Sequence, residues 1–139
     1  MSVTINGTTG VTTVDLTASG NVSVTGTITA LGDIDVSGAA TGTITIDNDL
    51  SFNMTAGNNF KCTPTVNGTL TFTNITSGQS GNIWLDNSGG YTISAASTVY
   101  ISASNLDTLS TAGIYFISYY SDGINVAVAV TNAITSGGA

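Results

Sequence analysis

The chain has 139 residues and a formal net charge of −7, with eight acidic side chains, all Asp, and a single basic one, Lys61. It contains no His, no Glu, no Arg and only one Cys. This composition excludes most catalytic designs, because they use those side chains as general base, raised-pKa acid or oxyanion partner. It also excludes an internal disulfide.

The charge pattern excludes two further classes of partner. Nucleic acid and anionic membranes are bound largely through Lys and Arg, and Lys61 is the only cation of the chain. No apolar run reaches the roughly 18 residues that a transmembrane helix needs. The opening "MSVTINGTTG" has neither the basic nor the apolar region of a secretory signal. We therefore expect no nucleic-acid partner, no membrane association and a soluble protein made in the cytoplasm.

The residue types favour strands over helices. Thr occurs 25 times and Gly 17 times, whereas the charged helix formers are nearly absent. Val, Ile and Thr alternate with small polar residues, which is typical of half-buried strands. The composition predicts an all-β protein.

The chain changes character near position 41. All ten aromatic residues follow position 51, so residues 1–41 lack the side chains that dominate the energetics of protein cores. The segment "GAATG", residues 38–42, is the expected joint. We predict a Thr/Gly-rich β-repeat stem or docking arm over residues 1–41 and a compact domain over residues 42–139.

The stem contains a short internal repeat. "GNVSVTG" at residues 20–26 returns twelve residues later as "GDIDVSG" at residues 32–38. Each copy places two apolar residues at alternate positions, but two-stranded ribbons of this size are marginal in water. Identical chains could bury these residues by supplying the facing surfaces, so we predict a homotrimer. The candidate trimer-seam residues are Val22, Val24, Ile34 and Val36.

The second part has many short strand signals. Strands are expected at residues 43–46, 50–54, 69–73, 82–85, 91–93, 98–101, 113–119 and 124–130. Residues 105–112 could form a helical turn or a crossover loop. Asn67-Gly68 and Asp122-Gly123 are dipeptides that tight hairpins prefer. Short strands at these intervals predict a β-sandwich or jelly-roll-like domain.

Two pairs of carboxylates are candidates for chemistry. Asp33 with Asp35, and Asp47 with Asp49, would each share one face of a strand. The glycosidase interpretation lacks an acid buried against aromatic rings, and the calcium interpretation lacks the Gly and Glu of an EF-hand loop. We interpret these residues as solvated carboxylates that oppose edge-to-edge aggregation, with a metal on a three-fold axis as the alternative. No cofactor and no metal site are predicted, and Cys62 is expected to be a buried, inert hydrophobe.

The aromatic cluster at residues 115–120 has two interpretations. Alternation places Tyr115 and Tyr119 on one face of a strand and Phe116 and Tyr120 on the other, and in a sandwich one of these faces is core. Tyr119 and Tyr120 are therefore candidates for a subunit interface or for stacking against a glycan.

Two segments carry a resemblance to a known group of proteins. "LTFTNITSGQSGNIWLDNSGGYTI" at residues 70–93 and "GIYFISYYSDGINVAVAV" at residues 113–130 resemble the C-terminal β domain of structural proteins of tailed bacteriophages. The N-terminal "VTINGTTGVTTVDLTASGNVSVTG" is similar to the low-complexity openings of phage fibre proteins. The resemblance implies a non-enzymatic homotrimer on the virion surface, made in the host cytoplasm.

The resemblance leaves the place in the virion open. A stem of 41 residues leaves little room for both a tail-docking domain and a shaft, so we expect a decoration, cement or head-fibre protein that binds the major capsid protein and stabilises the shell. The alternative is a short tail fibre or spike tip that binds a host-surface glycan. A non-viral β adhesin repeat is disfavoured because no signal peptide is seen.

Overall fold

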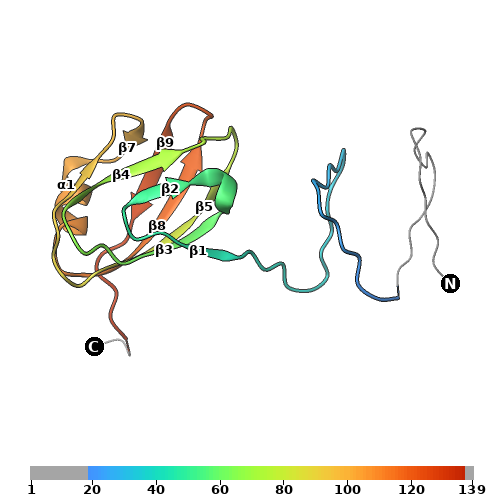
Figure 1. Cartoon of the computed structure of the whole chain (residues 1–139), viewed down its shortest axis with the longest axis horizontal. Helices are drawn as coiled ribbons and strands as arrows, with labels where there is room; N and C mark the ends of the chain where they lie inside the picture. The colour runs from blue at the N-terminus through green and yellow to red at the C-terminus, as the bar shows by residue number, and fades with distance from the viewer. Residues whose placement is uncertain (1–18, 137–139) are drawn as a thin grey trace. The chain divides into compact units, whose positions relative to one another are not determined.

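The computed structural model of the chain describes residues 19–136 (Figure 1), and the chain divides between Gly38 and Ala39 into two units. The second unit contains one 3₁₀ turn, η1 (Met54–Ala56), and one α-helix, α1 (Ala103–Leu109). Its strands are β1 (Ile44–Ile46), β2 (Ser51–Asn53), β3 (Asn59–Cys62), β4 (Gly68–Thr73), β5 (Ser80–Asn87), β6 (Ile93–Ala95), β7 (Val99–Tyr100), β8 (Gly113–Ser121) and β9 (Val126–Val130).

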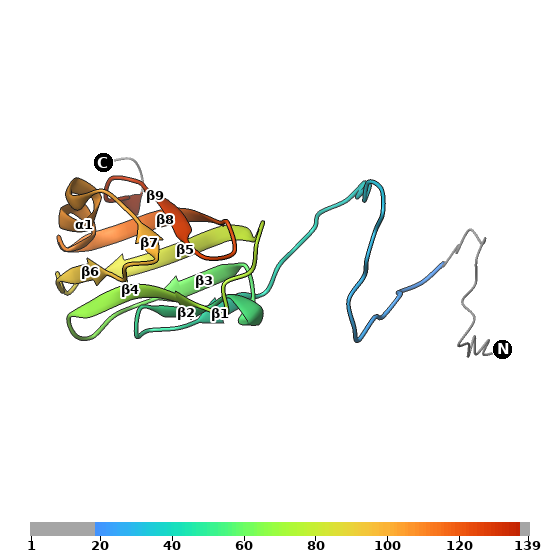
Figure 2. The same ribbon diagram turned by 90° about the horizontal axis from the view of Figure 1, so that it is seen from above.

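The strands form two sheets that lie face to face (Figure 2). The larger sheet has the order β1-β3-β5-β8-β9-β7, and the smaller has the order β2-β4-β6. From β1 to β6 the chain alternates between the sheets, and each strand runs parallel to the preceding strand of its own sheet. This part of the chain is therefore a coil whose turns stack side by side.

The turns of this coil differ in length. Ile44 pairs with Asn59, 15 positions later, and Asn59 pairs with Asn82, 23 positions later. The loops between the strands absorb the difference. A coil with unequal turns leaves no fixed period in the sequence, because only the strands must stay in register.

The last strands complete the larger sheet. β8 pairs antiparallel with β5 and with β9, and β7 adds to the far side of β9. The β8–β9 connection is a hairpin around Asp122 and Gly123, as its dipeptide predicted. Gly123 has a φ of +100°, and the Asp122 side chain accepts hydrogen bonds from the backbone N–H groups of Ile124 and Asn125, at 2.8 and 2.7 Å.

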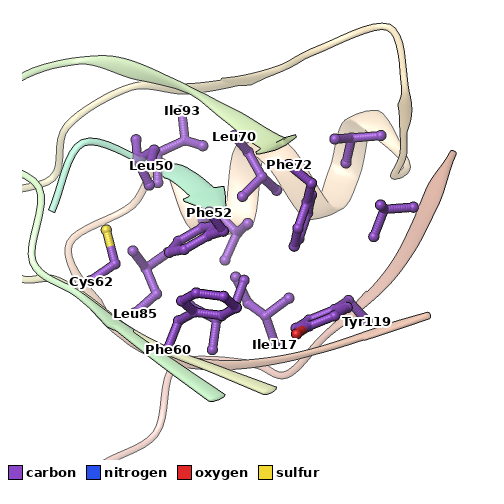
Figure 3. Packing of buried hydrophobic residues seen from close by; sticks show 14 of the residues in the cluster. Leu50, Phe52, Phe60, Cys62, Leu70, Phe72, Leu85, Ile93, Ile117 and Tyr119 are labelled. Atoms are coloured by element: carbon purple, nitrogen blue, oxygen red, sulfur yellow. The ribbon is translucent and has the colours of Figure 1, made fainter. Parts of the chain in front are cut away.

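The core between the sheets is built on four aromatic rings (Figure 3). Phe52 and Phe72 come from the smaller sheet, and Phe60 and Tyr119 come from the larger one. The ring centroids are 5.1 Å apart for Phe52–Phe60 and for Phe72–Tyr119, and 5.7 Å apart for Phe52–Phe72. Tilted rings at this spacing add to the free energy gained by burying their area.

Helix α1 covers one end of this core. Ser102 begins the helix by accepting a hydrogen bond from the Asn105 N–H at 3.2 Å, and Leu109 is fully buried. The carbonyl of Leu109 in turn accepts a hydrogen bond from the buried side chain of Asn87 at 2.8 Å. The segment predicted as a helical turn or a crossover loop, residues 105–112, therefore overlaps this short helix.

The all-β prediction is confirmed at the level of class. Two sheets lie face to face, as in the sandwich form of the prediction, but the jelly-roll form is wrong. Jelly rolls are antiparallel, whereas most strand pairings of the second unit are parallel. The strand at Asn59–Cys62 was not predicted. Asn67-Gly68 does not form a hairpin, because the strands on either side of it, β3 and β4, belong to different sheets.

The described part of the first unit, residues 19–38, bends at regular intervals. Bends lie at residues 19–20, 25–26, 31–32 and 37–38, so each bend ends on a glycine and the period is six residues. The twelve-residue repeat is therefore two hexads long. The intervening hexad, "GTITAL" at residues 26–31, keeps Ile28 and Ala30 at the two apolar positions but shares few other residues with its neighbours.

A buried amide provides a test of the second unit. Asn87 donates hydrogen bonds to the carbonyls of Tyr91 and Leu109 and accepts one from the Tyr91 N–H, at 2.8, 2.8 and 2.9 Å. Asn87→Ala leaves these backbone groups unpaired, so we expect it to lower the free energy of unfolding by about 3 kcal/mol in urea titrations. Exposed Asn132→Ala is the control, and equal effects of the two substitutions would contradict the structural role of Asn87.

Candidate interaction surface

The candidate seam residues are exposed in the isolated chain. Val22, Val24, Ile34 and Val36 each expose about half or more of their surface. No residue in the range 19–38 belongs to a strand or is buried. The prediction that these side chains meet those of other copies is not tested by a single chain, but nothing in their own described chain covers them.

The aromatic cluster on β8 divides as alternation predicted. Tyr115, Ile117 and Tyr119 are buried, whereas Phe116 and Tyr120 are exposed. The Tyr119 hydroxyl donates a hydrogen bond to the Asn58 carbonyl at 2.9 Å, and burial raises its pKa to about 12. Tyr119 is thus a core residue of its own chain, as one interpretation of the cluster allowed, and its side chain is not exposed for a subunit interface or for stacking on a glycan. Tyr120 remains available for either role.

Lys61 and Cys62 point to opposite sides of β3. Cys62 is fully buried, as predicted, and burial raises the pKa of its thiol to about 11, so the thiol stays protonated near neutral pH. Lys61 is exposed on the outer face of the larger sheet. The two side chains therefore do not form a reactive pair.

The Asp pairs are not arranged as strand neighbours. Asp47 and Asp49 lie in the turn between β1 and β2, and Asp49 accepts a hydrogen bond from the Ser51 N–H at 2.8 Å. Asp33 and Asp35 are exposed in the first unit, and no strand is formed in its described residues, 19–38. Among the described residues no group of three or more potential metal ligands is found.

The Gly-Gln-Ser-Gly segment at residues 78–81 has a packing role. The Gln79 side-chain amide donates hydrogen bonds to the Met54 carbonyl and to the Asn58 side chain, both at 2.7 Å. Gly81 lies so close to the Asn58 carbonyl that a Cβ would be 1.7 Å from its oxygen. These contacts hold the loop between η1 and β3 against β5. Packing therefore explains why a Gln stands at position 79 and a Gly at position 81, without a role in ligand binding.

An apolar hollow on the second unit was not predicted from the sequence. It lies on the outer face of the larger sheet and has a volume of about 510 Å³. Its lining comprises Thr41, Gly42, Ile44, Asn59, Phe60, Lys61, Asn82, Trp84 and Phe116. The alternation of β5 and β8 could have shown that Trp84 and Phe116 share a face. It could not have placed β1 and β3 beside them, because β3 was not predicted.

The strand register brings the lining residues together. Ile46 pairs with Lys61, Lys61 with Trp84, and Trp84 with Phe116, so these four side chains form a row across four strands. Ile44, Asn59 and Asn82 form the adjacent row. The hollow therefore combines an indole, a phenyl ring, two amides and the only cation of the chain.

Comparison with known proteins identifies no relative. No family model, no curated protein and no solved structure matches the chain. No helix in the described residues is long and apolar enough to cross a membrane.

The turn between β1 and β2 gives a pH-dependent prediction. Burial and the neighbouring Asp49 carboxylate raise the pKa of Asp47 above its ordinary value of 3.8. A raised folded-state pKa stabilises the fold below that ordinary value, and the contribution is lost as the pH rises through the folded-state pKa. We expect Asp47→Asn to raise the melting temperature at pH 7 but not at about pH 3, where the natural carboxyl is already neutral.

Thermal melts at the two pH values check this expectation. Asp107→Asn, which removes an exposed carboxylate from α1, serves as the control for the general effect of lowering the net charge. An Asp47→Asn chain that melts like the natural chain at pH 7, or that gains no more than the control, would contradict the prediction.

Proposed function

We propose that this protein is a non-enzymatic structural protein of a tailed bacteriophage, located on the exterior of the capsid as a homotrimer. The observation that carries the proposal is the period-six stem with uncovered apolar side chains. Residues 20–37 make three hexads, and each hexad has two exposed apolar residues at alternate positions. An element of this kind is complete only when other chains cover it.

The bend pattern favours a three-sided arrangement of copies. Straight segments that bend every six residues trace the edges of a triangular coil, as in the hexapeptide repeats of β-helices. Three hexads supply one turn of such a coil, so the chain has no second turn of its own among the described hexads to pair with. Other copies of the chain would supply the neighbouring edges, their hydrogen bonds and the apolar contacts at Val22, Val24, Ile34 and Val36.

The chemistry of the chain supports a structural role. It has no His, Glu or Arg, its Cys62 is buried with a raised pKa, and Asp33, Asp35, Asp47 and Asp49 all lie outside the strands. The resemblance of residues 70–93 and 113–130 to phage structural proteins points the same way. In this role the protein binds the major capsid protein and stabilises the shell.

A short tail fibre or spike tip that binds a host-surface glycan is the second candidate. The hollow beside Trp84 is the observation that favours it, because an indole ring with amides from Asn59 and Asn82 nearby suits a sugar face and its hydroxyl groups. Tyr120 lies exposed on the same sheet face. The capsid is preferred because a stem attached to a small body suits a protein that docks on a shell.

The stem proposal predicts severe effects of charge at the apolar positions. Val24→Asp and Val36→Asp would each place three unpaired carboxylates in an apolar seam, which costs several kcal/mol. We expect light scattering to give about three times 13.9 kDa for the natural chain and a reduced mass for both variants.

Ser23→Asp is the matched control for these variants. Ser23 occupies the same hexad position as Asp35, so a carboxylate is already accepted there. Normal trimers in both Val variants, or a monomeric natural chain at micromolar concentration, would refute the stem proposal.

The location on the virion is tested with particles that lack this protein. A ligand of the assembled shell stabilises it by mass action, so stripped particles should release their genome at lower temperature while still adsorbing to host cells at the normal rate. Purified virions should carry the protein in hundreds of copies rather than in a dozen or two. Normal particle stability with lost adsorption would favour the tail-tip alternative instead.

A further inference from the structure

The two outer faces of the second unit differ in chemistry. The smaller sheet turns only small polar side chains outward, namely Ser51, Asn53, Thr69, Thr71, Thr73 and Ser94. The larger sheet turns large apolar and aromatic side chains outward, namely Ile44, Ile46, Trp84, Tyr100, Phe116 and Tyr120. We call this second surface the aromatic face. One fold thus presents a face suited to water and a face that water solvates poorly.

Most apolar side chains of the aromatic face lie in two rows, on either side of the hydrogen-bonded pair Asn82 and Ser118. Ile46, Lys61, Trp84 and Phe116 form one row, and Tyr120 and Tyr100 both flank Ala127 in another. Parallel strands such as β1, β3 and β5 usually occur in sheets that are covered on both faces. Here the inner face is covered by the smaller sheet, whereas Trp84 on the outer face remains 44 % exposed.

The few charges of the aromatic face allow it to pack against the same face of another copy of the chain. The chain carries a net charge of −7, yet the strands of this face turn only one cation, Lys61, and one anion, Asp86, outward. Two copies of the face can therefore approach without the repulsion that the rest of the acidic surface would cause. The face also lacks the cluster of positive charge that would mark an acidic partner.

The short connection between the stem and β1 indicates which partner covers the aromatic face. Only five residues separate Gly38, where the stem ends, from Ile44 at the start of β1. Five residues can span at most about 20 Å between these two positions. Three copies joined by their stems would therefore hold three β1 strands, and the aromatic faces that begin at β1, close to one axis.

We infer that the aromatic face is an interface between copies of this chain, packed around the three-fold axis that the stems define. The inference rests on the proposed trimer and adds which surface of the second unit joins it. The hollow beside Trp84 receives apolar side chains of a neighbouring copy, and the Ser/Thr/Asn face of the smaller sheet is left outward. Tyr120 is then a subunit-interface residue.

Trp84 itself reports on this interface, because it is the only Trp of the chain. Its emission and its quenching by acrylamide are measured on the full chain, together with the mass by light scattering. We expect a trimer with blue-shifted emission, and a quenching constant several-fold lower than in the monomer that Val24→Asp produces. Lys61, the only lysine, should likewise be protected from acetylation in the trimer.

Substitutions on the two sides of the second unit provide matched variants. Phe116→Asp places a carboxylate on the aromatic face, and we expect it to lower the mass or to expose Trp84 to acrylamide. Ile124→Asp and Val66→Asp change residues that are even more exposed but lie outside this face, and they should leave both readings unchanged. Circular dichroism establishes that each variant is folded.

Each outcome decides the inference. A trimer in which acrylamide reaches Trp84 as freely as in the stem-disrupted monomer would overturn the interface and leave the proposed trimer intact. A monomeric natural chain would overturn both. If Trp84 is protected from acrylamide in a chain of monomer mass, residues of the same chain cover it. If a bacterial polysaccharide quenches an accessible Trp84, the hollow binds a glycan. Either result overturns the inference.

Discussion

The contact that the second unit depends on is the four-ring cluster between its sheets. Phe52 and Phe72 reach it from β2 and β4, and Phe60 and Tyr119 reach it from β3 and β8. Ring pairs of this kind contribute about 0.5–1.5 kcal/mol each beyond the burial of their area. The cluster joins the coil of parallel strands to the antiparallel β8–β9 hairpin. Strands as short as β1 and β2, with three residues each, are held in place mainly by what they pack against.

The alternation of the chain between the sheets determines the two outer faces. Each strand from β1 to β6 sends one set of side chains into the shared core and the other set outward. Apart from Thr45 and Asn87, the inward set of these strands is aromatic and aliphatic in both sheets, so the outward sets distinguish the two sheets. The smaller sheet keeps Ser, Thr and Asn, which remain well hydrated, whereas the larger sheet keeps Ile, Trp, Phe and Tyr. That difference is the physical basis of the proposed interface at Trp84 and Phe116.

The stem and the second unit differ in how their apolar side chains can be buried. In the second unit long-range contacts within one chain bury the apolar side chains. In the stem each hexad has two small apolar positions and a bend, and the described residues bury none of them. A chain with so little apolar surface per residue cannot offset its conformational entropy alone. The proposed symmetric assembly would lower this deficit, because each copy would cover apolar side chains of the others.

Much of the secondary structure could be predicted from the sequence. The composition predicted the β class, and the position of the aromatic residues predicted where the stem ends. Alternation along β8 predicted that Tyr115 and Phe116 face opposite ways, and Asp122-Gly123 predicted the hairpin. These are local properties, because the side chains of a strand alternate and a positive φ favours Gly. Only the tertiary structure decided that the pairings are mostly parallel, that Asn67-Gly68 is not a hairpin, that Tyr119 is buried, and that Ile46, Lys61, Trp84 and Phe116 share one row. The turns of the coil are 15 and 23 residues long at that row, so the sequence has no fixed period that would show which strands are neighbours. The pairing of the strands depends instead on the packing of the four rings between the sheets.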